Sequence, residues 1–239
     1  MAKLYGIGVG VGDPELITLK AIRKIKELDV VILPEAKNIG ESTAYTIAKE
    51  YMKENVEKVA ISFKMQDSWE ERREDHKRNA VIVNELLEAG KNVGFLTIGD
   101  PMTYSTFVYI MELLKEGVNV ETVPGITSFA SITARVNIPL VMGDESMKVV
   151  GLAKETDIIK EIESSDNIIF MKVVRNLERL KDALRETGNM NNVILISNCG
   201  KEDEQIIYDL EDVGKDDISY FSTMILKKGG IEKWKRFTS

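Results

Sequence analysis

The first turn of the chain reads Gly6-Ile-Gly-Val-Gly-Val-Gly-Asp-Pro-Glu15, and it closes a predicted strand at residues 3–9. Glycines let the backbone turn sharply and let a ligand approach the main chain closely. A helical pattern of leucine and isoleucine follows at residues 15–28. Asp13 and Pro14 suit the N-cap and the first position of that helix, so the turn also has a purely structural interpretation.

Strand and helix patterns alternate through the first half of the chain. Apolar runs such as residues 30–33 are typical of buried parallel strands, and the alternation predicts an open parallel sheet. Near the C-terminus, residues 205–210 and 219–226 are two extended stretches without a clear helix between them, which predicts antiparallel pairing. We therefore expect an α/β fold of two domains, an N-terminal open parallel sheet in residues 1–117 and a C-terminal mixed sheet in residues 118–239.

Composition limits the class of protein. The chain has 239 residues, of which 44% are hydrophobic and 30% charged, so it is long enough to bury a substantial core. Cys199 is the only cysteine and cannot form an internal disulfide, and the longest apolar runs are too short to span a bilayer, so we expect a cytoplasmic protein. The net charge of −7 disfavours generic nucleic-acid binding, and a single histidine without a cysteine cluster disfavours a metal site.

Two further loops follow predicted strands. They read Thr97-Ile-Gly-Asp-Pro-Met-Thr-Tyr104, before a predicted helix at residues 103–115, and Val123-Pro-Gly-Ile-Thr-Ser-Phe129. Because ligands bind at the carboxyl ends of parallel strands, three such loops predict one crevice. Taken alone, Asp100 is suited first to capping a helix with Pro101 at its first position, and second to binding an ammonium group.

A dinucleotide-binding turn is the main rival for the glycine-rich segment. It needs glycines at i, i+2 and i+5, but Val11, Asp13 and Glu15 stand at the third position of every triplet here. Glu35 ends the second strand, where a ribose-binding acid would stand, and this keeps a nucleotide-binding oxidoreductase open as an alternative.

Taken together, the three loops resemble the tetrapyrrole (corrin/porphyrin) methylase family. The family pattern is a Gly-Pro-Gly-Asp-Pro turn with a Leu-Thr-Leu-Lys-Ala helix, then Gly-Asp-Pro, then a strand end with Pro-Gly-x-x-Ser. The matching stretches are Gly10-Val-Gly-Asp-Pro-Glu-Leu-Ile-Thr-Leu-Lys-Ala21, Gly99-Asp-Pro101 and Val123-Pro-Gly-Ile-Thr-Ser128. Val11 stands where the family usually has proline, and the turn should keep its shape because neither residue needs a positive φ.

The resemblance implies two α/β domains with S-adenosylmethionine bound in the cleft between them, and a homodimer. Residues 99–109, with Gly125-Ile-Thr-Ser-Phe129 and Gly143-Asp-Glu-Ser146, are similar to the branch that methylates C20 of precorrin-2, or of its cobalt form, in cobalamin (vitamin B12) biosynthesis. We therefore expect a methyltransferase that releases S-adenosylhomocysteine. Methylation of uroporphyrinogen III or of another corrin carbon is the nearest alternative, and methylation of ribosomal RNA or of a modified histidine is more distant.

Carried over by position, the family's cofactor contacts fall on Val11, Ile98, Gly99, Asp100, Thr103, Thr127, Ser128, Met171 and Cys199. Met171 is suited to pack on adenine or simply to fill the core, and Cys199 is expected to contribute mainly backbone. Tyr104, beside the expected cofactor loop, is the candidate catalytic side chain. No metal site in the protein is expected, since any cobalt arrives inside the substrate.

The tetrapyrrole substrate carries carboxylates, so several cations should meet it. The candidates are Lys64, Arg72, Arg73, Arg135, Lys172 and Arg175. The run Glu70-Glu-Arg-Arg-Glu-Asp-His-Lys-Arg78, which contains the single histidine, is interpreted first as a solvated helix face and second as a substrate contact.

Overall fold

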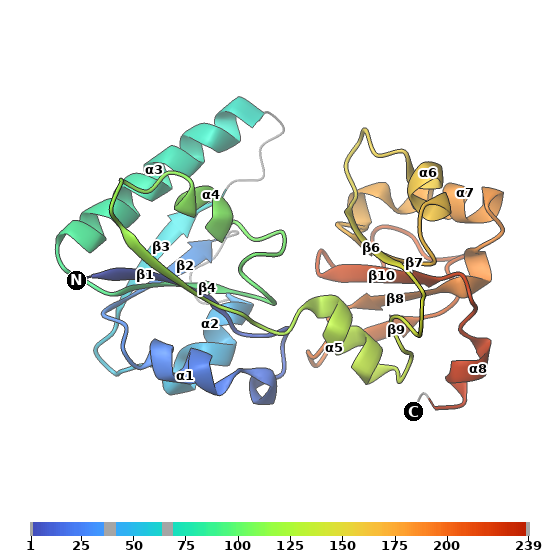
Figure 1. Cartoon of the computed structure of the whole chain (residues 1–239), viewed down its shortest axis with the longest axis horizontal. Helices are drawn as coiled ribbons and strands as arrows, with labels where there is room; N and C mark the ends of the chain where they lie inside the picture. Colours follow the sequence, from blue (N-terminus) through green and yellow to red (C-terminus); the bar gives the residue numbers. More distant parts are fainter. Residues whose placement is uncertain (1, 36–41, 64–68, 238–239) are drawn as a thin grey trace. The chain divides into compact units, whose positions relative to one another are not determined.

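The computed structural model describes residues 2–35, 42–63 and 69–237. The chain divides into two compact units, Met1–Thr127 and Ser128–Ser239 (Figure 1). This division lies later than the predicted boundary after Gly117. The reason is strand β5 (Asn119–Val123), which pairs in parallel with β1 (Lys3–Gly8) and so belongs to the first sheet.

The first unit is built on a five-stranded sheet in which every pairing is parallel, as predicted. The strand order is β3-β2-β4-β1-β5, with β2 at Val30–Glu35, β3 at Glu57–Ser62 and β4 at Val93–Thr97. Its α-helices are α1 (Leu19–Ile25), α2 (Thr43–Ala48), α3 (Trp69–Glu88) and α4 (Phe107–Met111).

Alternating residues of the strands point into two hydrophobic cores in this unit. Tyr5 and Ile7 pack with α1 and α2, whereas Leu4 and Phe95 pack with α3 and α4. The two helix pairs therefore cover opposite faces of the sheet (Figure 1). This layering leaves the loops at the carboxyl ends of the strands free for function.

Two predicted helices are shorter in the structure. The segment at residues 15–28 begins as a 3₁₀ turn, Pro14–Leu16, capped by Asp13, and the α-helix starts only after Thr18, whose hydroxyl accepts from the amide of Ala21 at 3.1 Å. The helix predicted at residues 103–115 is α4, and it starts at Phe107. At α1 the Thr18 side chain caps the helix, whereas the residue before α4, Thr106, makes no side-chain cap hydrogen bond.

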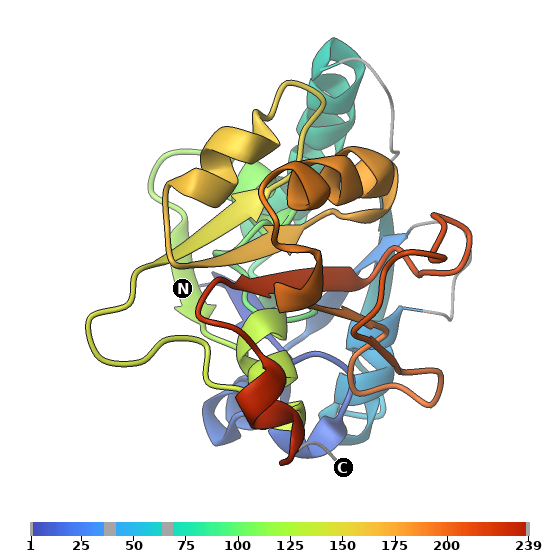
Figure 2. The same ribbon diagram turned by 90° about the vertical axis from the view of Figure 1, so that its right-hand side faces the viewer.

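The second unit is built on a five-stranded mixed sheet, which confirms the predicted antiparallel pairing. Its strands are β6 (Met147–Gly151), β7 (Asn167–Met171), β8 (Val193–Ser197), β9 (Gln205–Ile207) and β10 (Ser222–Lys227), in the order β6-β7-β10-β8-β9. Its helices are α5 (Ser128–Arg135), α6 (Ile158–Glu163), α7 (Leu177–Glu186) and α8 (Glu232–Lys235). In Figure 2, β10 crosses the middle of the sheet, antiparallel to both β7 and β8.

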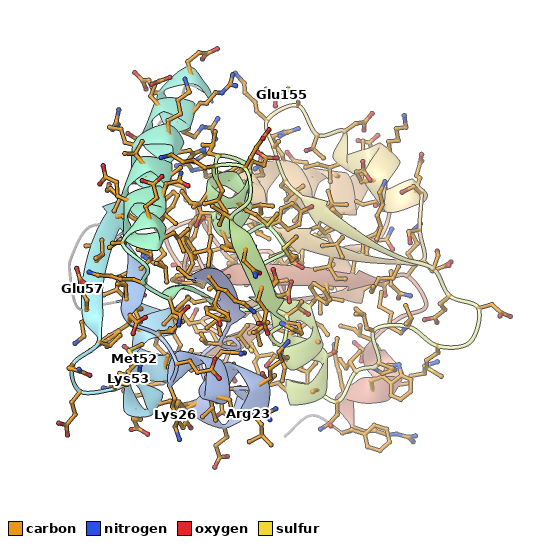
Figure 3. The ribbon with its side chains drawn as sticks, turned by 60° about the vertical axis from the view of Figure 1, so that its left-hand side comes forward. Arg23, Lys26, Met52, Lys53, Glu57 and Glu155 are labelled. Carbon is orange, nitrogen blue, oxygen red and sulfur yellow. The ribbon has the colours of Figure 1, made fainter. Side chains whose placement is uncertain are left out.

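Charged side chains cover the exposed edge of the first sheet at β3. Glu57 forms an ion pair with Lys91, and Lys53 lies 3.8 Å from the carboxylate of Asp29. Figure 3 shows Lys53 and Glu57 on the outside of this edge. Charges at an edge strand discourage pairing with another chain.

A buried ion pair ties one loop of the second unit to its sheet. The Lys227 ammonium on β10, 2% exposed, donates to Glu145 Oε2 at 2.7 Å and to Asn167 Oδ1 at 3.3 Å. Glu145 also accepts from the Asn167 side-chain amide and the Met142 backbone amide, both at 3.0 Å. A cation this deeply buried requires a partner, so the loop before β6 is held by Lys227.

Replacing Glu145 with alanine should destabilise the chain because it leaves the Lys227 ammonium buried without a carboxylate. We expect urea unfolding to show that the free energy of unfolding falls by about 2–3 kcal/mol. This is less than for a fully buried pair, because the Glu145 carboxylate is partly exposed. Adding Lys227→Met should recover part of that loss. Glu232→Ala, which breaks an exposed pair with Lys235, should change stability by less than about 0.5 kcal/mol.

The same pair should respond to acid. The hydrogen bond from Lys227 lowers the pKa of the Glu145 carboxyl, so its stabilising contribution is complete above the ordinary glutamate pKa of about 4.5 and is lost as the pH falls through the lower folded value. The stability difference between wild type and Glu145→Ala should therefore shrink below that pH. A difference that is constant down to acid-induced unfolding would contradict the assignment.

Candidate functional site

Three loops of the first unit meet backbone to backbone at the carboxyl ends of β1, β4 and β5. A Cβ atom added to Gly8 would lie 2.5 Å from the Gly125 nitrogen and from the Gly99 oxygen, and one added to Gly125 would overlap that same oxygen. The amide of Gly99, whose φ is 74°, donates to the Gly10 carbonyl at 2.8 Å. The predicted meeting of the three loops is confirmed.

Asp100 links the second loop to the third. One carboxylate oxygen accepts from the Met102 amide at 2.9 Å and from the Thr103 hydroxyl at 3.4 Å, and the other accepts from the Gly125 amide at 3.2 Å. The alternative in which Asp100 caps a helix that begins at Pro101 is wrong, because α4 begins only at Phe107 and its N-cap is Thr106. The partly exposed carboxylate keeps lone pairs for an ammonium group.

Ser105, which was not among the expected site residues, lies two residues before the first residue of α4. Its buried hydroxyl lies 3.0 Å from the Thr97 hydroxyl and accepts from the Phe107 amide at 3.1 Å. A serine shortly before an apolar run is a known helix-start signal. Ser105 therefore carries a local sequence signal for the nearby start of α4.

Tyr104 is presented at the surface by an unusual backbone conformation. Its φ is 51° and its side chain is 50% exposed. A positive φ is uncommon for a bulky residue and costs on the order of 1–3 kcal/mol, so such residues concentrate at functional sites. Val11 is buried and Ile98 packs against the core beside α1 and α2, so these two positions offer mainly backbone groups to a ligand.

The cofactor candidates of the second unit lie where β7 and β8 end and β10 begins. The Ser128 hydroxyl is 3.3 Å from that of Thr223, and Thr223 stands opposite Met171 in the register of β10 and β7. Cys199 directly follows β8, with its sulfur 3.9 Å from the Ser131 hydroxyl. The candidates thus form two groups, one in each unit. The first comprises Val11, Ile98, Gly99, Asp100, Thr103, Tyr104 and Thr127, and the second Ser128, Met171 and Cys199.

The Cys199 thiol is unreactive in this setting. Burial raises its pKa to about 11, although the Ser131 hydroxyl opposes the shift. The thiol therefore stays protonated at neutral pH and is a poor nucleophile.

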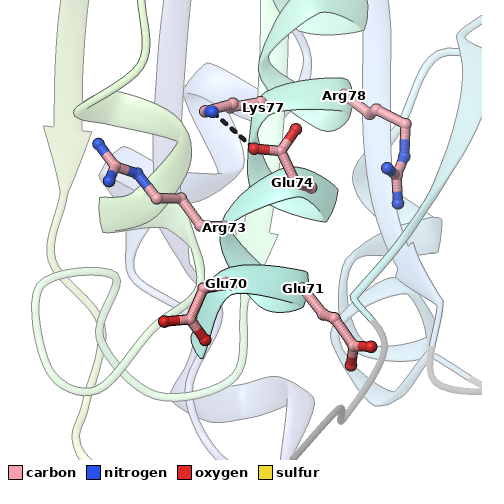
Figure 4. A pocket seen from close by; sticks show the side chains of 6 residues that line it. All are labelled: Glu70, Glu71, Arg73, Glu74, Lys77 and Arg78. Carbon is pink, nitrogen blue, oxygen red and sulfur yellow. Dashed lines mark hydrogen bonds and ion pairs between the residues drawn. The ribbon is translucent and has the colours of Figure 1, made fainter. Parts of the chain in front are cut away.

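The expected substrate cations differ in their surroundings. Arg135 is paired with Glu204 at 2.9 Å, and Lys172 has a φ of 61° immediately after β7. Lys64 lies outside the described residues. Arg73 lies on α3 in the shallow hollow of Figure 4, which charges of both signs line, including the pair of Lys77 with Glu74 at 2.6 Å. The hollow fits the interpretation of this helix face as solvated.

His76 departs from that interpretation because it is buried. Its ring stacks on Tyr109 of α4 with centroids 4.5 Å apart, and burial lowers its pKa, so it is neutral at pH 7.

Among the residues that the structure describes, no group of three or more His, Cys, Asp or Glu is placed to hold a metal ion. Within the same residues, no helix combines the length and apolar character needed to cross a bilayer.

The glycine turn lacks the geometry of a dinucleotide site. Such a site places a pyrophosphate at the N-terminus of the helix that opens directly from the turn. Here a 3₁₀ turn follows, and α1 begins only at Leu19. The side chain of Glu35 lies outside the described part of the chain.

Comparison with known proteins indicates the same family that the three loops resemble. The family model described as Tetrapyrrole (Corrin/Porphyrin) Methylases matches residues 3–213. A cobalt-precorrin-2 C(20)-methyltransferase of Salmonella typhimurium is 33% identical over 95% of this chain and 96% of its own length. A probable cobalt-precorrin-2 C(20)-methyltransferase of Methanocaldococcus jannaschii is 38% identical over the same shares.

Solved structures share the fold. A cobalt precorrin-4 methyltransferase superposes with a TM-score of 0.71 at 23% identity over 94% of both chains. A uroporphyrin-III C-methyl transferase from Thermus thermophilus, complexed with S-adenosyl homocysteine, superposes with a TM-score of 0.67 at 23% identity over 95% of this chain and 98% of that one. With the family model spanning residues 3–213, the chain belongs to the tetrapyrrole (corrin/porphyrin) methylase family.

Proposed function

We propose that this chain transfers a methyl group from S-adenosylmethionine to C20 of cobalt-precorrin-2, or of metal-free precorrin-2, in cobalamin biosynthesis. The observation that carries the C20 assignment is the nearly full-length similarity to the two C(20)-methyltransferases. Family membership and the meeting of the three loops support the broader assignment to methyl transfer.

The residues present fit S-adenosylmethionine chemically. The partly exposed Asp100 carboxylate suits the ammonium of the methionine part, and the hydroxyls of Thr103, Thr127 and Ser128 suit its polar groups. Glycine at the loop crossings brings bare backbone to the surface of the site. We assign cofactor binding to these four residues and to Val11, Ile98, Gly99, Met171 and Cys199.

S-adenosylmethionine, when bound, supplies an activated methyl group, so that the S–CH₃ bond breaks as the bond to C20 forms and the C20 proton leaves to solvent. The protein's task is then mainly alignment, which can supply up to roughly 7–11 kcal/mol of a barrier. Asp100 and the Gly99 backbone hold the donor in place. Tyr104 contacts the acceptor through its exposed phenol, whose hydroxyl orients the macrocycle by hydrogen bonding.

We further propose that the enzyme is cytoplasmic, works as a homodimer, and binds neither nucleic acid nor membrane. The family resemblance supports the dimer, and the single cysteine supports a reducing compartment. The cobalt ion, where present, belongs to the substrate. Light scattering on the purified protein tests the dimer.

The product distinguishes this function from its neighbours in the family. Anaerobic incubation with S-adenosylmethionine and cobalt-precorrin-2 should add one methyl group, located at C20 by mass spectrometry and by NMR of a ¹³C-labelled methyl. Uroporphyrinogen III, offered under the same conditions, should remain unmethylated. A methyl group found at any other carbon would contradict the C20 assignment.

Tyr104→Phe should slow methyl transfer without weakening cofactor binding, because it removes only the phenolic hydroxyl. We expect kcat to fall roughly 5- to 10-fold, which corresponds to the free energy that one hydrogen bond contributes to the transition state. The dissociation constant of S-adenosylhomocysteine, measured by calorimetry, should not change. Tyr208→Phe is the matched control in the second unit, and a Tyr104→Phe enzyme with the kcat of that control would refute the assigned role.

A further inference from the structure

Two adjacent aromatic side chains are exposed on the turn before β10. Tyr220 is 56% exposed and Phe221 is 43% exposed. Their rings meet edge to face, with centroids 5.4 Å apart and planes at 80°. Single exposed apolar residues are ordinary on a protein surface, but a packed pair is a candidate contact surface.

The turn that carries these rings is held tightly. The Ser219 amide donates to the buried Ser197 hydroxyl at 2.9 Å, and the buried Ser222 hydroxyl donates to the Ser219 carbonyl at 2.6 Å. The Asn198 amide donates to the Phe221 carbonyl at 3.1 Å. Exposure of the rings is therefore built into the backbone, and little conformational entropy is lost when a ligand covers them.

Cations accompany the two rings. The Lys201 ammonium lies 4.2 Å from the centroid of the Phe221 ring. Arg175 follows the end of β7 by four residues, and Met171, the last residue of β7, stands opposite Thr223, two residues after Phe221. Partial burial raises the pKa of the Tyr220 phenol, and the charge of Arg175 opposes that shift. We call Arg175, Lys201, Tyr220 and Phe221 the aromatic–cation surface.

Two nearby carboxylates, those of Asp203 and Glu204, have partners of their own. Asp203 accepts from the Asn198 side-chain amide at 2.6 Å. Glu204 is paired with Arg135 at 2.9 Å and accepts from the Gly200 amide at 2.8 Å. Arg135 thus offsets the charge of Glu204, whereas Asp203 keeps a negative charge that acts on the Lys201 ammonium.

The surface is continuous with the cofactor candidates of the second unit. Phe221 precedes Ser222 and Thr223 on β10, and Thr223 stands opposite Met171 and beside the Ser128 hydroxyl. The Asn198 amide that holds the Phe221 carbonyl comes from the residue directly before Cys199. A ligand on the rings would thus lie at the same end of β7, β8 and β10 as the assigned cofactor residues.

We propose that the aromatic–cation surface binds the tetrapyrrole substrate. Tyr220 and Phe221 pack against the apolar part of the flat macrocycle, while Lys201 and Arg175 meet its carboxylates. This inference rests on the proposed function and adds to it the residues that recognise the substrate. Flat ring contacts and several weak ion pairs acting together suit a large, polyanionic, apolar-faced ligand.

The test is a split between substrate and cofactor affinity. Tyr220→Leu and Phe221→Leu, made singly, should each raise KM for cobalt-precorrin-2 roughly 3- to 10-fold. Lys201→Gln should also raise KM, and less so at high salt because the contact is ionic. The kcat and the calorimetric dissociation constant of S-adenosylhomocysteine should remain those of the wild type.

The matched control is Phe237→Leu. Phe237 is 50% exposed with the Arg236 guanidinium 4.6 Å from its ring centroid, so it repeats the aromatic–cation pairing on a different segment. Its replacement should leave KM unchanged. Circular dichroism checks folding, and if Phe221→Leu lowers Tm, the half-exposed Tyr220→Leu and the charge variant Lys201→Gln decide.

Two results would overturn the inference. A KM that matches the Phe237→Leu control would show that the rings do not touch the substrate. Weaker S-adenosylhomocysteine binding by the same factor would assign the surface to the cofactor. Wild-type protein that methylates uroporphyrinogen III instead of cobalt-precorrin-2 would refute the C20 function alone, and the same variants would then be measured with that tetrapyrrole.

Discussion

The contact on which the site depends is a crossing of three backbones. Gly8, Gly99 and Gly125 approach so closely that a methyl group on Gly8 or Gly125 would meet main-chain atoms rather than a flexible side chain. Main-chain atoms cannot move aside as the end of a flexible side chain can. A residue larger than glycine at Gly8 or Gly125 would therefore force the loops apart. The crossing holds the loops after β1, β4 and β5 in one group, and Asp100 adds a hydrogen bond from the second loop to the third.

The parallel sheet brings those loops together before any side chain acts. Its strand order sets β4 and β5 on either side of β1, so the loops that follow these strands are neighbours in space. The mixed sheet of the second unit reaches a similar result differently. Because β10 is antiparallel to β7 and β8, its first residues lie beside the last residues of both, and Ser128, Met171 and Cys199 gather there.

Much of this arrangement was readable from the sequence because it depends on local patterns. Alternating apolar strands and helices predicted the parallel sheet, and repeated glycine-containing loops at strand ends predicted their meeting. Helix starts were predicted less well. The Asp100 carboxylate accepts from the amide of Gly125, which is distant in sequence, and α4 begins only at Phe107. The roles assigned to the site residues remain predictions.

Other features depend on long-range contacts that leave no local pattern. Lys227 looks like an ordinary surface cation until Glu145 and Asn167 are brought beside it. His76 stands in a strongly charged run and is nevertheless buried against Tyr109 of another helix. The unit boundary moved for the same reason, because β5 finds its partner, β1, at the other end of the unit.

The most direct test of the central claim adds one methyl group to the crossing and measures cofactor affinity. By calorimetry, Gly125→Ala should weaken S-adenosylhomocysteine binding at least roughly tenfold, because the loops must separate to admit the new carbon. Gly229→Ala, whose added carbon would meet only Glu145 Oε1 at 3.7 Å, should bind as the wild type does. Equal affinity in folded Gly125→Ala and wild-type protein would contradict the account.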